Sequence, residues 1–543
     1  MNIICIILIV LSLPGFCWCE NIHPNYLRLP LEGQIKTIDP SLTFDMASIE
    51  LTEQLFLGLT NYSYRNSAYR IVPELAQRWT IHEQGTVYHF ELKKNIFWVN
   101  GSGEIIRPVT AHDVVWAIQR NINPQTDAPY ASALFVLKNA KSIYEKTITD
   151  MNALGVHAID DYTVEFQLTY AASYFPAMLT MWIYRPLPKE IIEKFEDQWT
   201  RPEHILTNGA YTLSEWKKRR KIVLKSNIHF EKPVSRIPEI HYYIVPESFA
   251  ALNMYIKNRL DVIGGNYTRF SPMGIFRISK QESLSSEHIQ TTRFAVYSYH
   301  FNAIRPPVNN VWVRKAITAA IDRALLVDVI TKGGEQPAST FTHPAFLGIK
   351  NNLPYSDHHF DPNKARSYLE KAGYPNGDNF PELILCYDIS DTHHVIARSF
   401  QIMLKHFLNI NVTLEAKEWA DFIDTIDQPD KHKVPHLFRF GWASDYLDAN
   451  NFLNEAFSHS RNFSGWNDDA FDSLLQQASQ EQDLNKRLIL YQQAEKIIST
   501  DQVAIVPLYY ESDHYLIKPW VKGINPMPIG GQHIEKWIIS DDE

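Results

Sequence analysis

Strand-like and helix-like patterns alternate along the whole chain, and this alternation limits the fold more than any other feature. In residues 86–92 every second side chain is large and apolar, which predicts a half-buried strand. Thr110, followed by Asp113 and then by the apolar run 114–116, predicts a capped helix start. Asn310 and Asp361 predict two further helix starts, and Gly373 predicts the end of the second. We therefore expect mixed α/β and α+β layers.

The chain is too long for a single hydrophobic core. It has 543 residues, whereas one core rarely grows beyond about 250–300 residues. The proline-rich segments 185–188 and 306–307 are typical of stiff connectors, although composition does not change across either of them. From these patterns alone we expect two or three mixed domains.

Charge and aromatic content narrow the class of partner. The formal net charge is −9 and no long basic run occurs, which argues against nucleic acid because phosphate binding needs a positive patch. Aromatic residues make up 13% of the chain. This content indicates either large buried faces or a cleft lined by aromatic rings.

The N-terminal segment has the pattern of an export signal. Residues 3–13 are apolar except for Ser12, a length that suits a signal-peptide core and is too short to span a bilayer. Cys17 and Cys19 are small enough for the positions before a cleavage site, so we expect a signal peptide over 1–19 with cleavage after Cys19. The alternative is a buried N-terminal strand. Export predicts a location outside the cytoplasm.

Cysteine usage is consistent with a domain that needs no disulfide. After removal of residues 1–19 the chain keeps Cys386 alone. It lies in the apolar run 383–387, so we expect an inert thiol in the core.

Catalytic signatures are missing from the sequence. It contains no HExxH, GxSxG, Walker A or GxGxxG motif and no paired CxxC. Histidine pairs occur at 358–359 and 393–394, but neighbouring residues of a strand point to opposite faces and seldom hold one ion. The segment 357–361 could collect a metal in a loop, and a solvated loop is the simpler interpretation. We expect a protein that is not an enzyme and that has no metal or other cofactor.

Short segments spread over nearly the whole mature chain carry a more specific signal. They are 55–60 (LFLGLT), 72–79 (VPELAQRW), 85–92 (GTVYHFEL), 98–101 (WVNG), 108–113 (PVTAHD), 207–213 (TNGAYTL), 313–316 (VRKA), 320–323 (AIDR), 361–366 (DPNKAR), 441–446 (GWASDY), 505–510 (IVPLYY) and 518–521 (KPWV). In this order they resemble the solute-binding proteins of peptide ABC importers, and within that family the periplasmic oligopeptide-binding members of Gram-negative bacteria.

The resemblance implies a bilobal periplasmic-binding-protein fold of the class II type with an extra domain. Domain I would be discontinuous, and the implied domains are 20–56, 189–290 and 512–543 for domain I, 57–188 for domain II and 291–511 for domain III. The two lobes would close on the ligand about a hinge. The implied function is an extracytoplasmic, monomeric receptor that captures short peptides and delivers them to the membrane permease of an ABC importer.

The resemblance also implies a set of peptide-binding residues. Asp445 would accept the ammonium group of the peptide, which needs a buried anion because an unpaired buried charge is very costly. Trp442 and Trp419 would wall side-chain pockets, Tyr130 would line the cleft from domain II, and Gly441 would offer its backbone to the ligand. The alternatives are a surface turn for Asp445 and ordinary core positions for the aromatic rings.

Two cationic positions match those that the family uses near the peptide carboxylate. They are Arg439 and His393, and their alternatives are an exposed surface charge and a partly buried histidine.

The chain also departs from the family pattern. Phe44 stands where a close member has an acidic residue, with Asp45 next to it but expected to point elsewhere. Ile426 replaces an arginine near the ligand terminus, and the disulfide positions of that member fall at Ala295 and Ala443. We therefore expect a changed preference in peptide length or in the C-terminal group.

Two other functions remain open at this stage. One is a specialised cargo in the same fold: a dipeptide, a murein peptide, haem or nickel. Asp445 favours a ligand with a free amine over haem or metal. The other is a secreted hydrolase, against which the missing motifs argue.

Overall fold

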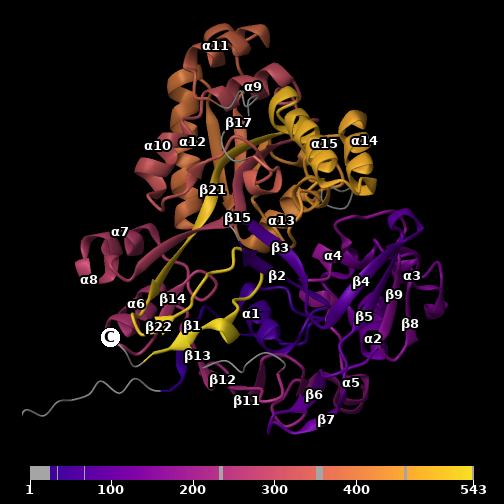
Figure 1. Ribbon diagram of the computed structural model, residues 1–543. Helices are drawn as coiled ribbons and strands as arrows, with labels where there is room; N and C mark the ends of the chain where they lie inside the picture. Colours follow the sequence, from indigo (N-terminus) through magenta and orange to yellow (C-terminus); the bar gives the residue numbers. More distant parts are fainter. Residues whose placement is uncertain are drawn as a thin grey trace, which may run out of the picture.

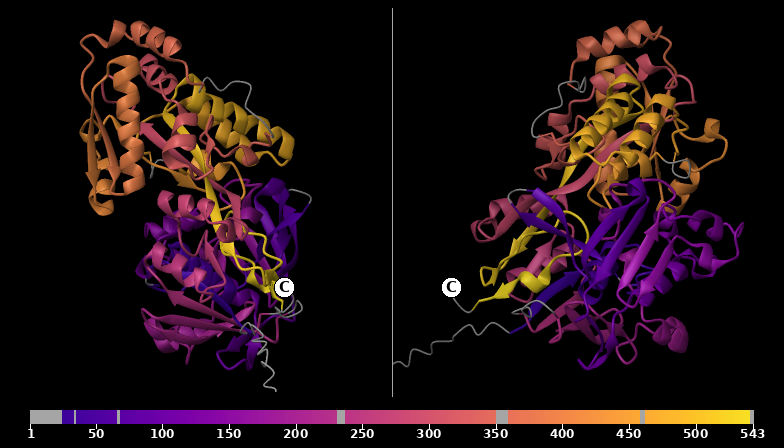
Figure 2. Two further views of the ribbon diagram at one scale, coloured as in Figure 1. Left: turned by 90° about the vertical axis from the view of Figure 1, so that its left-hand side faces the viewer. Right: turned by 45° about the vertical axis from the view of Figure 1, so that its right-hand side comes forward.

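The computed structural model describes residues 25–33, 35–65, 68–230, 237–349, 359–457 and 462–540. The expected signal peptide 1–19 and His358 of the candidate metal loop lie outside these residues. Figures 1 and 2 show two lobes, a lower one built around the N-terminal half of the chain and an upper one formed by residues from about 300 to 510. Within the described ranges, no helix has both the length and the apolar character needed to cross a membrane.

The lower lobe contains two four-stranded sheets. The first has the order β1 (Leu27–Leu31), β13 (Glu239–Ile244), β12 (Lys221–Ser226), β11 (Tyr211–Lys217), with β1 parallel to β13. The second has the order β4 (Ala76–His82), β5 (Val87–Leu92), β9 (Thr163–Gln167), β8 (Val156–Asp160). Three smaller sheets complete it: β10 (Leu206–Thr207) with β6 (Phe97–Asn100) and β7 (Ile105–Pro108), the hairpin β2 (Thr60–Arg65) and β3 (Ala68–Pro73), and β22 (Val521–Lys522) with β23 (Ile538–Ile539).

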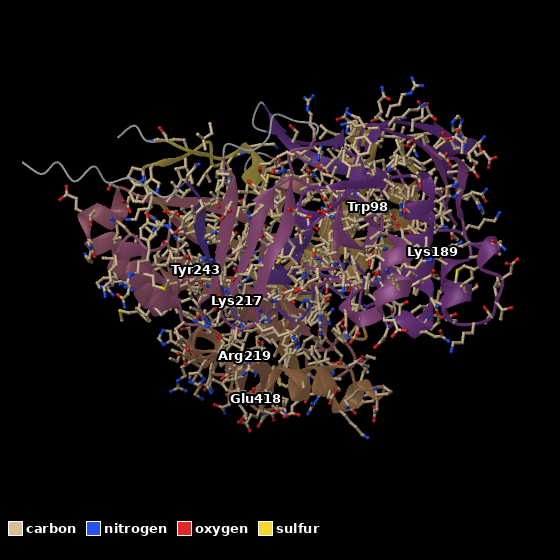
Figure 3. All side chains as sticks on the ribbon, turned by 90° about the horizontal axis from the view of Figure 1, so that it is seen from below. Trp98, Lys189, Lys217, Arg219, Tyr243 and Glu418 are labelled. Atoms are coloured by element: carbon tan, nitrogen blue, oxygen red, sulfur yellow. The ribbon has the colours of Figure 1, made fainter. Side chains whose placement is uncertain are left out.

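Helices cover these sheets. They are α1 (Met46–Leu55), α2 (Ala111–Ile122), α3 (Ala140–Tyr144), α4 (Phe175–Met178), α5 (Lys189–Phe195), α6 (Ser248–Ile256), α7 (Pro272–Lys280) and α8 (Glu282–Ser285). Seen from below, the exposed Lys217 and Arg219 mark the turn between β11 and β12 at the surface of this lobe (Figure 3).

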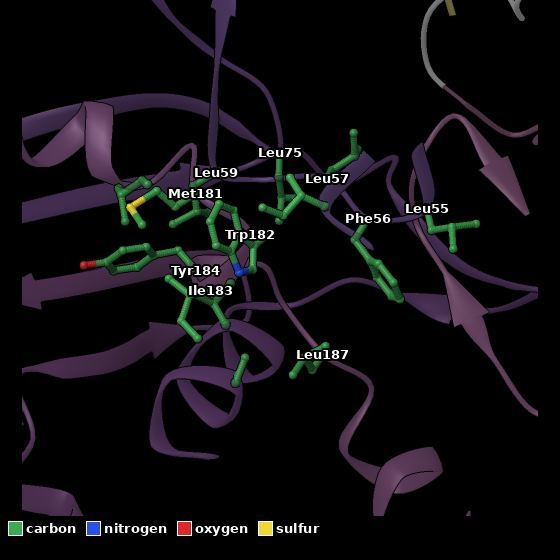
Figure 4. Packing of buried hydrophobic residues seen from close by; sticks show 14 of the residues in the cluster. Leu55, Phe56, Leu57, Leu59, Leu75, Met181, Trp182, Ile183, Tyr184 and Leu187 are labelled. Atoms are coloured by element: carbon green, nitrogen blue, oxygen red, sulfur yellow. The ribbon is translucent and has the colours of Figure 1, made fainter. Parts of the chain in front are cut away.

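One large core unites the lower lobe. Residues 55–59 pack beside residues 181–187, as the close view in Figure 4 shows. The proline-rich segment 185–188, expected as a connector, is itself buried: Leu187 is fully buried, and Arg185 forms an ion pair with Glu53 at 3.5 Å between Nη2 and Oε1. The parts of the chain on either side of this segment therefore share one hydrophobic core.

Two long antiparallel strands connect the lobes. β15 (His288–Phe301) and β21 (Ile505–Ile517) pair from the lower lobe, where β14 (Val262–Gly264) joins β21, up into the upper lobe. Their register breaks between the pairs Thr292–Ser512 and Val296–Tyr510. Residues 293–295 therefore lie opposite Glu511 alone, so the ladder is interrupted between the lobes.

The upper lobe extends the same sheet. Beyond β15 follow β19 (Leu437–Arg439), β17 (Leu383–Asp388) and β18 (Val412–Lys417), while β16 (Gln336–Pro337) pairs with β21 and β20 (Trp442–Ala443) with β15. The helices of this lobe are α9 (Val311–Ala319), α10 (Arg323–Leu325), α11 (Pro362–Lys371), α12 (Asp391–Leu408), α13 (Trp419–Ile426), α14 (Asp469–Gln480) and α15 (Leu484–Lys496).

The sequence signals for one strand and three helix starts are confirmed. The strand expected at 86–92 is β5, with Tyr88 and Phe90 fully buried. Thr110 forms the capping box of α2 with Asp113, whose side chain accepts from the Thr110 backbone N–H at 2.8 Å. Asn310 and Asp361 likewise cap α9 and α11.

The end of α11 also follows the sequence signal. This helix ends at Lys371, and Gly373 then takes φ +95°, a left-handed value that favours glycine. The expected mixture of α/β and α+β layers is present in both lobes.

Candidate functional site

A cavity of about 310 Å³ lies between the lobes. Among the described residues, three larger hollows, of about 790, 690 and 380 Å³, hold none of the predicted site residues. The cavity is lined from the lower lobe by Phe44, Met46, Ile49, Tyr130, Trp182, Asn266 and residues 528–530, and from β15 and the upper lobe by Arg293, Phe294, Trp419 and residues 439–445. Six predicted site residues therefore meet here: Tyr130, Trp419, Arg439, Gly441, Trp442 and Asp445.

The segment 441–445 lies along the connecting strand β15. Ala443 and Ala295 are direct antiparallel partners, and the backbone N–H of Ser444 donates to the carbonyl of Phe294 at 2.9 Å. The two positions at which the resemblance placed a disulfide in another member are thus adjacent here and carry methyl groups. Gly441 has no room for a side chain, because a Cβ there would lie 2.8 Å from the carbonyl oxygen of Val296.

A single side chain fixes the two ends of this segment. The Oδ1 atom of Asn451 accepts hydrogen bonds from the indole Nε1 of Trp442 at 2.9 Å and from the backbone N–H of Asp445 at 3.1 Å. Asn451 is buried, and Asp445 itself is half-buried at the cavity. Sequence reasoning missed Asn451, because an asparagine at the start of a short helical segment carries no pattern that would single it out.

Aromatic rings form much of the cavity wall. Trp442 is buried, Tyr130 packs edge-on against Trp182 at 4.8 Å between centroids, and Trp419 at the start of α13 is 54% exposed. Phe44 is 46% exposed. The wall therefore combines a packed base with two accessible rings.

The cationic end of the cavity is a network around Asp388. Arg439 Nη1 lies 3.4 Å from Asp388 Oδ1, and His393 Nε2 lies 3.5 Å from Asp388 Oδ2. The guanidinium of Arg439 also sits 5.3 Å over the ring of Tyr297, whose hydroxyl hydrogen-bonds His393 Nδ1 at 3.1 Å. Arg439 lines the cavity, whereas His393 stands behind it and reaches it only through Asp388 and Tyr297.

Charges in this network hold each other ionised. Burial raises the pKa of Asp388, but the hydrogen bond from His393 and the charge of Arg439 outweigh burial and leave the pKa lowered. Burial lowers the pKa of Arg439, and the neighbouring Tyr297 and Asp388 outweigh it so that the pKa is raised. Arg439 therefore keeps its positive charge inside the cavity.

Arg293 is a second cation at the cavity that sequence reasoning missed. It lies at the register break of β15, is 8% exposed, and forms ion pairs with Asp513 at 3.2 Å and with Glu511 at 3.5 Å. Burial raises the pKa of Glu511, but positive charges from both lobes, including Arg293 and Arg439, lower it further than burial raises it. The break in the β15–β21 register brings Arg293 to the cavity. No local pattern in the sequence predicts this break.

The structure corrects the expectation for Ile426. This residue does not lie at the cavity; it is fully buried on α13 in a cluster with Cys386 and Phe438. Its helix turns that face toward the sheet, so Ile426 makes no direct contact with a ligand in the cavity.

Two other expectations hold. Asp45 does point elsewhere, since its side chain caps α1 by accepting from the backbone N–H of Ser48 at 3.0 Å. Cys386 is a fully buried thiol whose pKa burial raises to about 12.

Among the described residues, no group of three or more histidine, cysteine or acidic side chains could hold a metal ion.

Comparisons with known proteins agree with this architecture. The family described as bacterial extracellular solute-binding proteins, family 5 Middle, matches residues 70–464. The periplasmic oligopeptide-binding protein OppA of Escherichia coli (strain K12) is 32% identical, over 90% of this chain and 88% of that protein. The probable deoxycholate-binding periplasmic protein YgiS of the same strain is 31% identical, over 90% and 88%. The unliganded open form of the periplasmic murein tripeptide-binding protein MppA superposes with a TM-score of 0.79 at 28% identity, over 95% of this chain and 97% of that one. The predicted resemblance and fold class are confirmed.

Proposed function

The chain belongs to the bacterial extracellular solute-binding proteins of family 5, and we propose that it captures short peptides between its lobes and delivers them to the membrane permease of an ABC importer. The named relatives are binding proteins, and we propose no catalytic activity for this chain. The observation that carries the proposal is the cavity between the lobes, which holds a carboxylate, a buried guanidinium and aromatic walls on one continuous surface.

This arrangement suits the groups that all peptides share. Asp445 accepts the ammonium group, a charge-assisted contact that contributes about 1.5–3 kcal/mol net. Arg439 binds the carboxylate and His393 supports it from behind through Asp388. The segment around Gly441, held as a strand along β15, provides the place where an extended ligand backbone lies beside the protein backbone.

The walls accept side chains of different shapes. Trp442, Trp419 and Tyr130 offer flat apolar surface that bonds no particular side chain. A receptor for many peptide sequences needs this combination of fixed polar ends and permissive walls.

Closure of the lobes buries the ligand. We assign the hinge to the register break between β15 and β21, because the ladder is interrupted there and both strands pass from one lobe to the other. The three-domain division stays part of the proposal: domain I over 20–56, 189–290 and 512–543, domain II over 57–188 and domain III over 291–511. Domains I and II would share the core of the lower lobe.

The proposal includes location and partners. The relatives are periplasmic proteins, and a signal peptide over 1–19 would export this chain to the same compartment. The receptor would act as a monomer, and its net charge of −9 argues against nucleic acid as a partner.

Replacing the carboxylate of Asp445 tests the function. Asp445→Asn should weaken binding of a tripeptide at least tenfold, since about 1.4 kcal/mol corresponds to a factor of ten. N-acetylation of the peptide should weaken binding to the unchanged protein similarly, with little further loss in the variant. Asp424→Asn is the matched control, because Asp424 is exposed on α13 and does not line the cavity. If isothermal titration finds unchanged affinity for Asp445→Asn, Asp445 does not bind the ammonium group of the peptide.

Mass spectrometry of the purified protein separates the remaining functions. A mixture of released peptides supports the proposal, one defined species indicates a specialised cargo, and turnover of an added peptide indicates a hydrolase. Titration with deoxycholate tests the ligand suggested by the name of one relative. Binding of deoxycholate with no binding of any peptide would overturn the proposal.

A further inference from the structure

The loop that carries Phe44 to the cavity is held in place by hydrogen bonds from side chains of the lower lobe. Asp39, at the base of this loop, accepts hydrogen bonds from Arg120 Nη1 and Nη2 at 2.8 and 2.7 Å and from Trp199 Nε1 at 2.9 Å. The carbonyl of Thr43, adjacent to Phe44, accepts from the indole of Trp182 at 2.8 Å. Because the backbone before Phe44 is held at both points, little order has to be created when a ligand contacts the ring.

The ring of Phe44 nevertheless remains accessible. Among the described residues that line the cavity, Phe44 and Trp419 are the two large apolar side chains that count as exposed, at 46% and 54%. They come from opposite lobes, Phe44 from the loop before α1 and Trp419 from the start of α13. Apolar rings on a preformed cavity wall that are left uncovered by the protein are surface that an apolar ligand group can bury.

The charge near Phe44 favours the same class of ligand group. The ammonium of Lys36 lies 5.1 Å from the centre of the Phe44 ring. A basic ligand side chain placed against this ring would meet a like charge. The ring itself brings no charge, at a position where the resemblance placed an acidic side chain in another family member.

We propose that Phe44 determines specificity within the peptide-binding function proposed above, on which this inference rests. In this role the ring of Phe44 contacts one large apolar side chain of the bound peptide. The substrate class is therefore short peptides that carry an aromatic or branched aliphatic residue at that position, and peptides with lysine or arginine there are disfavoured.

Position isomers of one tripeptide test the assignment. Phe-Ala-Ala, Ala-Phe-Ala and Ala-Ala-Phe, with the three matching lysine isomers and Ala-Ala-Ala, are titrated against the unchanged protein. At one position phenylalanine should bind at least tenfold more tightly than lysine. Phe44→Ala should reduce that preference severalfold and leave Ala-Ala-Ala and the other two positions unchanged.

Three further variants sharpen the result. Phe44→Glu should reverse the preference toward lysine at the same position, and Lys36→Gln should improve binding of the lysine isomer without changing that of the phenylalanine isomer. Phe249→Ala is the matched control, because Phe249 is a phenylalanine of similar exposure, 43%, on α6 outside the cavity. Thermal unfolding shows whether each variant is folded. We expect the Phe44 variants to be folded, since Phe44 is not part of a core cluster.

The outcomes separate this inference from the function on which it rests. If no peptide binds the unchanged protein, the proposed function fails. If Ala-Ala-Ala binds and requires its free amine, but Phe44→Ala leaves every phenylalanine-to-lysine ratio unchanged, the function stands and the role of Phe44 is overturned.

Discussion

Tyr446 of the upper lobe stacks on Tyr174 of the lower lobe, with ring centroids 6.0 Å apart and planes inclined by 12°. Tyr446 is 2% exposed and belongs to the core cluster of the lower lobe, although its neighbour Asp445 lines the cavity. Its hydroxyl accepts a hydrogen bond from Asn450 Nδ2 at 2.8 Å. The proposed amine anchor is therefore adjacent in the chain to a ring that fastens one lobe to the other.

The first prediction concerns this ring. Tyr446→Ala should lower the free energy of unfolding by about 3–5 kcal/mol, as for other buried aromatic residues, and should also weaken peptide binding although Tyr446 does not line the cavity. Tyr446→Phe keeps the stack and loses only the hydrogen bond from Asn450, so it should cost about 0.5–1.5 kcal/mol. Chemical unfolding and peptide titration measure the two effects. Peptide affinity that is the same in all three proteins would show that the stack does not support the anchor.

The second prediction concerns Asn451. Asn451→Ala removes the acceptor shared by Trp442 and Asp445 and leaves two donors without it, at about 1–3 kcal/mol for each donor that stays unsatisfied. Because the backbone at Asp445 is released, binding of free-amine peptides should fall more than binding of N-acetylated ones. Asn450→Ala is the control, since it loses the bond to Tyr446 but leaves both bonds of Asn451 in place. An equal loss for both kinds of peptide would limit Asn451 to a purely structural role.

The sequence predicted those parts of the molecule whose signals are local. Helix starts at Thr110, Asn310 and Asp361 depend on a capping side chain and the residues directly after it, so they are visible in the sequence and present in the fold. The segment around Gly441 and Asp445 was identifiable for a similar reason, because its motif is contiguous.

What depends on distant packing could not be predicted. Arg293 reaches the cavity only because the β15–β21 register breaks there, and a strand pattern does not show a bulge. Tyr446 looked like part of a ligand motif and instead packs into the opposite lobe. Ile426 was placed near the ligand by resemblance, which gives a position in the chain but not the direction of a side chain on its helix.

The third prediction concerns the carboxylate end. Arg439→Gln should weaken binding of peptides with a free C-terminus about tenfold or more. Their affinity should then be close to that of the corresponding C-terminal amides, which cannot form the charged contact. Arg398→Gln, an exposed arginine on α12 away from the cavity, should leave the ratio of acid to amide affinity unchanged. Titration over di- to pentapeptides shows in addition which length brings the carboxylate to Arg439. If the unchanged protein already binds acids and amides equally, the C-terminus is held by other groups.

The fourth prediction concerns the pH dependence of stability. Glu50 on α1 is fully buried, where its Oε2 accepts from the backbone N–H of Gln532 at 2.8 Å and its Oε1 from the hydroxyls of Tyr242 and Tyr267, both at 3.3 Å. Burial is the main cause that raises the pKa of Glu50 from 4.5 to about 7. Between these two values the folded protein holds a proton that the unfolded chain releases. The free energy of unfolding therefore falls as pH rises from about 4.5 to about 7, by roughly 1.4 kcal/mol per pH unit, and this contribution is constant above and below that window.

Glu50→Gln isolates this contribution, because glutamine has a similar shape and does not titrate. Relative to the unchanged protein, the variant should gain about 3 kcal/mol of stability between pH 4.5 and pH 8, whatever its absolute stability at pH 4.5. Chemical unfolding of both proteins across this range measures the difference, and contributions from the other titrating groups cancel in it. Parallel stability curves for the two proteins would mean that Glu50 is already ionised in the folded state near pH 5, held so by the tyrosine hydroxyls and the Gln532 N–H.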